Sequence, residues 1–160
     1  MKHLNHENVI KFFTDFKDEE GNIYIIMEYM DGGNLCEFIS FYNELNIPIE
    51  EEKLWNIFAE FIKGLVYLHE KGLIHRNIKP ANLLLNSRGE IKYSDFSVSA
   101  IVNYEKAKEF ADKKINVEDL INDMVEVGSG KFAAPEIESD DYLEYDLEVD
   151  VYSLGITFCV

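Results

Sequence analysis

The chain is poor in cysteine, in long apolar runs and in basic residues. Its two cysteines, Cys36 and Cys159, form no Cys-x-x-Cys pair. A disulfide scaffold or a cysteine-based zinc site is therefore not expected, and a reducing intracellular compartment, cytoplasm or nucleus, fits. The longest apolar run, Ile23 to Met27, is far too short for a membrane span. The residues that follow Met1 carry no apolar core, so we expect no secretory signal.

The shortage of basic residues excludes two further classes of partner. Lys and Arg number 15 against 31 Asp and Glu, which gives a net charge of −16. Such a chain has little to neutralise phosphates, so we expect neither nucleic-acid binding nor adsorption to an anionic membrane surface. Hydrophobic residues at 47% and charged residues at 29% are typical of a globular domain, not of a disordered tail.

The first third of the chain predicts a β-hairpin followed by a short helix. Two β-rich runs, 9–16 and 23–30, flank the polar turn 17–22. The second run is almost continuously apolar, which predicts a strand covered on both faces. Asn34 is the expected N-cap of a helix that holds Leu35, Phe38 and Ile39.

The strongest helix signal begins at the acids 50–52 and stops at Gly72. A second hairpin is expected from runs 83–85 and 91–93. The apolar stripe of the long helix, spaced by three and four, consists of Leu54, Ile57, Phe58, Phe61, Ile62, Leu65 and Leu68.

The last third predicts another helix, over 103–127, capped by Asn116 and ended by Gly128. Eight acids and no base follow between Glu136 and Asp150, a run that we interpret as a solvated face or loop and not as a docking site. The chain then becomes apolar from Val151 to Val160. The whole pattern indicates an α+β protein.

Three motifs carry the chemistry. The loop His75-Arg76-Asn77-Ile78-Lys79-Pro80-Ala81-Asn82 follows the long helix, Asp95-Phe96-Ser97 follows the second hairpin, and Ala134-Pro135-Glu136 comes later. This order resembles the eukaryotic protein kinase family, whose signatures are H-R-D-L-x-x-x-N, D-F-G and A-P-E. Lys79 resembles the serine/threonine class. Further stretches that fit the family's hinge, the end of its long helix and the start of its central helix are 27–33, 67–69 and 150–155.

The resemblance covers 1–160 and implies an incomplete protein-kinase-like fold. Residues 1–30 would form two strands of the small lobe and the hinge. Residues 31–160 would form part of the mainly helical large lobe, truncated in its central helix, with the activation segment at 95–136. The polar linker Ser40 to Pro48 resembles that of NIMA-related kinases.

The resemblance also implies ATP and Mg²⁺ as cofactors and a protein as substrate or partner. Met27, Glu28 and Met30 would contact the nucleotide at the hinge. Asn82 and Asp95 are hard oxygen donors suited to Mg²⁺ and would hold the metal and the nucleotide phosphates.

The resemblance implies roles for three further residues. Lys79 would meet the γ-phosphate as a point charge. Ser129 resembles the threonine that closes onto the catalytic loop. His75 is interpreted as a core histidine with Phe96 and Phe12 as neighbours.

Two residues depart from the family pattern inside the motifs. Asn77 replaces the catalytic aspartate, and an amide cannot accept the proton of a substrate hydroxyl. General-base catalysis contributes about 10²–10⁴-fold, or roughly 3–5 kcal/mol of barrier. Ser97 replaces the glycine of Asp-Phe-Gly, which would restrict the backbone freedom of the loop.

The third departure concerns the phosphate clamp. No G-x-G-x-x-G occurs in the chain, so the glycine-rich loop, the strand lysine and its glutamate would lie upstream. The arginine partner that the family provides for Glu136 would likewise lie downstream. The segment 95–136 spans 41 positions, long enough to act either as a plug over the cleft or as a mobile insert. Arg76 would meet a phosphorylated residue of that segment, for which the candidates are Ser99, Tyr104 and Ser129.

Three functions remain open at this point. The chain is a pseudokinase with a binding or scaffold role, an active serine/threonine kinase that works without the base, or an incomplete domain without independent function. The substitutions at positions 77 and 97 favour the first, catalytically impaired reading.

Overall fold

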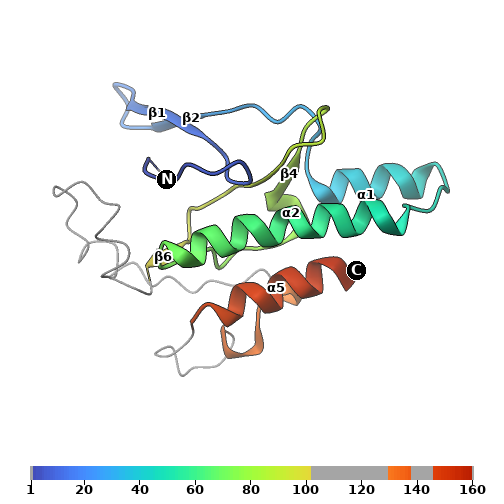
Figure 1. The fold of residues 1–160 in the computed structure, drawn as a ribbon. Helices are drawn as coiled ribbons and strands as arrows, with labels where there is room; N and C mark the ends of the chain where they lie inside the picture. Colours follow the sequence, from blue (N-terminus) through green and yellow to red (C-terminus); the bar gives the residue numbers. More distant parts are fainter. Residues whose placement is uncertain (1, 102–129, 138–145, 160) are drawn as a thin grey trace.

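The computed structural model describes residues 2–101, 130–137 and 146–159, and Figure 1 shows their arrangement. The helix expected over 103–127 and the candidates Tyr104 and Ser129 lie outside these residues. Short 3₁₀ turns occur at Pro80–Asn82, Gly130–Phe132 and Pro135–Ile137. The helices and strands, in chain order, are β1 (Phe12–Lys17), β2 (Ile23–Met27), α1 (Leu35–Glu44), α2 (Glu51–Glu70), β3 (Leu73–Ile74), β4 (Leu83–Leu85), β5 (Ile91–Tyr93), β6 (Ala100–Ile101) and α5 (Glu148–Cys159).

The hairpin β1–β2 forms as predicted, with Lys17 paired to Ile23 and Phe12 to Met27. The prediction that its second strand is covered on both faces is wrong. Every residue of β2 is exposed, and Ile23 keeps 63% of its surface accessible. Among the described residues, β1 and β2 pair only with each other, and no second layer buries any residue of β2.

Helix α1 begins at a capping box. The side chain of Asn34 accepts from the Glu37 backbone N–H, and the Glu37 carboxylate accepts from the Asn34 N–H, each at 3.0 Å. The predicted N-cap is confirmed, but the helix runs on to Glu44. Much of the expected linker from Ser40 to Pro48 is therefore helical, which removes the feature that resembled NIMA-related kinases.

Helices α2 and α5 pack against each other through aromatic side chains, and Figure 1 shows them side by side. The rings of Phe58 and Phe158 meet edge to face at 4.8 Å. Phe61 is fully buried and contacts Tyr93 of β5 at 5.3 Å between ring centroids. The Tyr93 hydroxyl donates to the Phe61 carbonyl at 2.9 Å, so β5 is fastened to the middle of α2.

The remaining strands position the loops that carry the motifs. β4 and β5 form the predicted second hairpin, with Leu83 opposite Tyr93. The backbone of Tyr93 also donates to the Asn8 carbonyl and accepts from the Ile10 N–H, both at 2.9 Å. The pair β3–β6 escaped prediction because two residues are too few to show a period.

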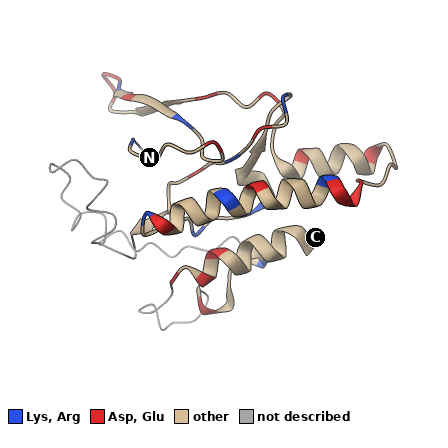
Figure 2. Ribbon diagram, in the orientation of Figure 1, with Lys and Arg blue, Asp and Glu red and all other residues tan. Residues whose placement is uncertain are grey.

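The charged residues are distributed as Figure 2 shows, with acids in the first turns of α2 and α5. The interpretation of 136–150 as a solvated run is wrong for one member. Glu148 is exposed, but Asp150 has no accessible surface at all. The helices that the structure describes are all too short or too polar to span a bilayer.

Gly64, in the middle of α2, provides a test of this packing. A Cβ there would lie 2.9 Å from the Asn8 Cβ and from the buried Tyr93 ring. We expect Gly64→Ala to lower the free energy of unfolding by about 1–3 kcal/mol, because the ring cannot move away. Gly155→Ala in α5 is the matched control: its Cβ would meet nothing within 4 Å, so the change should stabilise the protein by about 0.5–1 kcal/mol. Urea unfolding of both variants measures the difference, and an equal effect would contradict the packing.

Candidate active site

The loop that begins at His75 is held by a buried carboxylate from α5. Asp150 accepts the backbone N–H of His75 at 2.7 Å and that of Arg76 at 2.8 Å. The same carboxylate lies 3.0 Å from His69 Nε2 on α2. A buried charge is tolerated only when it is hydrogen-bonded in this way. Arg76 adopts φ 63°, and this left-handed turn aims two successive N–H groups at one carboxylate.

His75 is the core histidine that the sequence predicts, and its contacts determine its tautomer. Nε2 lies 2.9 Å from the Ser94 carbonyl, which only accepts, so Nε2 carries the proton. Nδ1 then accepts the Asn77 backbone N–H at 3.3 Å. The rings of Phe96 and Tyr93 lie beside it, whereas no ring contact joins it to Phe12 within the described part of the chain.

The burial of His75 makes stability depend on pH. Desolvation lowers the pKa of His75 below its usual 6.5, against the opposing influence of Asp150, the Ser94 carbonyl and Asp95. The folded state therefore keeps the ring neutral while the unfolded chain takes up a proton. The contribution to stability is full above pH 6.5 and is lost as the pH falls below it.

We expect the free energy of unfolding to fall by about 1 kcal/mol per pH unit below pH 6.5 because of His75 alone. The measurement is urea unfolding between pH 7.5 and pH 5. His75→Gln should remove this part of the slope, and the same change at the exposed His3 should leave it. Identical slopes in the wild type and His75→Gln would contradict the assignment.

Three of the predicted site residues, Asn77, Asn82 and Asp95, are brought together by the structure. The side-chain amide of Asn82 donates to the Asn77 carbonyl at 2.8 Å. The Asn82 carbonyl accepts from Ser94 through both its N–H and its hydroxyl. The side-chain amide of Asn77 donates to Asp95 Oδ2 at 2.8 Å. The loop 75–82 and the segment after β5 are thus joined at the site.

Lys79 belongs to the same loop, and its carbonyl accepts the Asn82 backbone N–H at 2.9 Å, but its side chain takes no part in this network. It stands immediately before the 3₁₀ turn Pro80–Asn82 in an extended conformation. In the part of the chain that the structure describes, no hydrogen bond or ion pair engages its ammonium group. The charge is therefore available to an incoming anion.

The donor chemistry at Asp95 suits Mg²⁺ in kind. The Asp95 carboxylate is exposed. The Asn82 side chain is buried, and its amide is hydrogen-bonded to Asn77 of the loop 75–82. Mg²⁺ commonly keeps several waters and takes one or two carboxylates together with substrate phosphates, so this set fits a metal that arrives with a nucleotide. Among the residues described here, no three His, Cys, Asp or Glu side chains form a metal-binding group.

The residues that the resemblance would place at a hinge lie along the exit from β2. Met27 ends the strand, and Met30 is buried. The Glu28 carboxylate accepts the Lys11 N–H at 2.7 Å and pairs with Lys92 of β5 at 3.0 Å. Sequence reasoning missed Lys92, although a lysine between Ile91 and Tyr93 in a buried strand is a signal that its charge needs a partner.

Arg76 is turned toward the residues that follow Asp95, where the resemblance would place the activation segment. Its side chain is buried, and Nε donates to the Val98 carbonyl. Of the phosphorylation candidates only Ser99 is described, and its hydroxyl lies 3.4 Å from the His75 carbonyl. The Arg76 side chain therefore contacts the backbone of the segment that follows Asp95.

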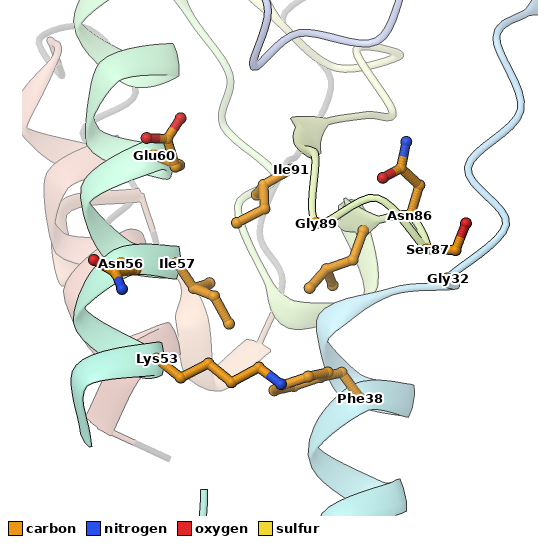
Figure 3. A pocket seen from close by; sticks show the side chains of 11 residues that line it. Gly32, Phe38, Lys53, Asn56, Ile57, Glu60, Asn86, Ser87, Gly89 and Ile91 are labelled. Atoms are coloured by element: carbon orange, nitrogen blue, oxygen red, sulfur yellow. The ribbon is translucent and has the colours of Figure 1, made fainter. Parts of the chain in front are cut away.

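A pocket of about 440 Å³ lies elsewhere, between α1, α2 and the turn of the β4–β5 hairpin (Figure 3). Its apolar wall includes Phe38, Ile57 and Ile91. Lys53 reaches across it, with its ammonium 5.0 Å from the centre of the Phe38 ring. None of the predicted site residues lines this pocket.

Comparison with known proteins gives one consistent result. The family described as "Protein kinase domain" matches residues 1–160. The serine/threonine-protein kinase dst2 of Dictyostelium discoideum is 32% identical over 160 residues, covering 98% of this chain and 12% of the relative. The serine/threonine-protein kinase CST20 of Candida albicans is 37% identical over 156 residues, which cover 98% of this chain and 11% of that relative. The serine/threonine-protein kinase STE20 of Yarrowia lipolytica is 35% identical over 156 residues, which cover 98% of this chain and 12% of that relative. The chain thus spans about an eighth of the length of these relatives.

Proposed function

This chain belongs to the protein kinase domain family, and from that premise we propose that it is a pseudokinase of the serine/threonine class. One observation carries the proposal. The residue at the position of the catalytic base is Asn77, and its side-chain nitrogen donates a hydrogen bond to Asp95. A group that donates there, and that has no accessible protonation equilibrium, cannot take the proton of an attacking hydroxyl.

The remaining residues would bind a nucleotide without completing the transfer. Asp95 and Asn82 would hold Mg²⁺, which when bound neutralises charge on the phosphates. The free ammonium of Lys79 would meet the γ-phosphate. The hinge residues Met27, Glu28 and Met30 would lie along the base of the nucleotide. Without a general base, we expect a loss of about 10²–10⁴-fold in the chemical step.

The partner in this proposal is an intracellular protein. The relatives are named serine/threonine-protein kinases, which act on proteins, and the family membership supports a protein ligand for this chain. Two alternatives remain distinct from the proposal. One is an active kinase that transfers phosphate to protein hydroxyls without the base, and the other is a scaffold that binds no nucleotide.

Two measurements on the purified chain distinguish these three hypotheses. Thermal unfolding is followed with and without millimolar Mg·ATP, and phosphate transfer from radiolabelled ATP to a generic serine/threonine substrate is assayed. A ligand at 100 times its Kd adds about 2.7 kcal/mol of stability, so we expect a rise of several degrees and no transfer above the Asp95→Ala variant. Transfer that Asp95→Ala abolishes would establish the active kinase. A cooperative melt indifferent to Mg·ATP would refute nucleotide binding and favour the scaffold.

A further inference from the structure

Asp95 is held by two neutral donors, and both come from positions that depart from the kinase pattern. Oδ2 accepts from the Asn77 amide at 2.8 Å. Oδ1 accepts from the Ser97 hydroxyl at 2.6 Å and, more weakly, from the Ser97 N–H at 3.4 Å. We propose that Asn77 and Ser97 form a latch that fixes the Asp95 carboxylate without a metal ion. The inference rests on the proposed function, because it concerns how the same site is regulated.

The first half of the latch follows from charge. A carboxylate at position 77 would face the Asp95 carboxylate across the 2.8 Å that now separates donor from acceptor. Two like charges at that distance repel each other strongly unless a cation lies between them. The amide replaces this repulsion with a charge-assisted hydrogen bond. Asn77 therefore stabilises the metal-free arrangement of the site.

The second half of the latch needs a side chain that glycine does not have. The Ser97 hydroxyl donates to Oδ1, whereas the Asn77 amide donates to Oδ2. Both carboxylate oxygens of Asp95 therefore accept a hydrogen bond. Asp95 has φ 56°, a left-handed conformation that a non-glycine residue adopts at some cost. Because Asn77 bonds one oxygen and Ser97 the other, the protein itself maintains this conformation without a metal ion.

The charge of Asp95 is nevertheless not neutralised by any residue that the structure describes. No ion pair reaches this carboxylate in the described parts of the chain, and Arg76 is directed at the Val98 carbonyl. A divalent cation is still attracted to the site, but it must share the oxygens with two donors whose hydrogens repel it. The latch therefore lowers the affinity of Asp95 for a divalent cation.

The test converts the donor at position 77 into a carboxylate. Asn77→Asp is compared with Asn86→Asp, a matched control in which a half-buried amide also donates to an exposed carboxylate, that of Glu90. Both changes add one negative charge and remove one amide donor. Thermal unfolding is measured in EDTA and in millimolar MnCl₂, and Mn²⁺ binding is titrated by electron paramagnetic resonance, in every case without nucleotide.

We expect Asn77→Asp to melt about 4 °C or more below Asn86→Asp in EDTA and to recover in MnCl₂. It should also bind Mn²⁺ about tenfold more tightly than the wild type, since ligand charge controls affinity. The wild-type melting temperature should change no more with Mn²⁺ than that of Asn86→Asp.

Ser97→Ala keeps the inference falsifiable if Asn77→Asp fails to fold in EDTA. This uncharged variant should melt a few degrees lower in EDTA, as expected for one lost charge-assisted bond, and should bind Mn²⁺ more tightly than the wild type. Equal melting and equal Mn²⁺ affinity of Asn77→Asp and Asn86→Asp, or a Ser97→Ala variant identical to the wild type, would overturn the latch. Because no readout involves phosphate transfer, an active wild-type chain would refute the pseudokinase and leave this test intact.

Discussion

Replacing Asp150 with asparagine is expected to lower the free energy of unfolding by about 3–5 kcal/mol. The carboxylate is fully buried and accepts two backbone N–H groups through its two oxygens. An amide supplies only one acceptor, and its NH₂ group would face an N–H donor of His75 or Arg76. The change also removes the negative partner of His69. A buried donor without an acceptor carries the full penalty of its desolvation.

The control for this prediction is Glu148→Gln, two residues earlier in α5. Glu148 is exposed, so the same loss of one charge should change stability by less than about 0.5 kcal/mol. Urea unfolding followed by circular dichroism gives both values. Similar stabilities for the two variants would mean that the loop 75–82 does not depend on α5 for its conformation.

Tyr93→Ala is the second change with a large expected effect, a loss of about 3–5 kcal/mol. The Tyr93 ring has no accessible surface and lies between Phe61 and His75. Its removal leaves a cavity that the rigid α2 helix cannot close. Burial raises the pKa of the Tyr93 hydroxyl well above 10, so the group stays neutral and donates to the Phe61 carbonyl.

Two further variants divide this effect into its parts. Tyr93→Phe should lose only the hydroxyl hydrogen bond, about 0.5–1.5 kcal/mol. Tyr29→Ala removes a tyrosine that is 87% exposed and should be nearly neutral, within about 0.5 kcal/mol. Unfolding in urea ranks the three. If Tyr93→Ala were no worse than Tyr93→Phe, the ring would not be part of the core.

The elements with a strong local period were predictable from the sequence. The stripe through α2 and the turn residues of both hairpins indicate these elements without tertiary information, and the Asn34 cap marks the start of α1. The errors occur where a strand or linker depends on what lies beside it. An apolar run such as β2 reads as covered whether or not a covering layer is present. Polar residues such as Ser40 and Asn43 concealed the last turn of α1, because their intrinsic helix propensity is weak.

The proximity of three candidate site residues was predictable from the sequence, but the hydrogen bonds between them were not. The motif order places Asn77, Asn82 and Asp95 in one site, and the structure brings them together through hydrogen bonds. The sequence gives no sign that Ser97 donates to Asp95, because a substitution for glycine reads first as a loss of backbone freedom. Asp150 was wrongly predicted to be solvated for a related reason. Its burial depends on the loop at His75 and Arg76, which is distant in the sequence.

The central claim is that Asn77 leaves this chain without a catalytic base, and phosphate transfer tests it most directly. The wild-type chain and Asp95→Ala are purified in parallel and given radiolabelled ATP, Mg²⁺ and a serine/threonine substrate under identical conditions. The account predicts that the two incorporate phosphate at the same background level. Wild-type incorporation that is reproducibly above the Asp95→Ala level would contradict the account and identify a working kinase.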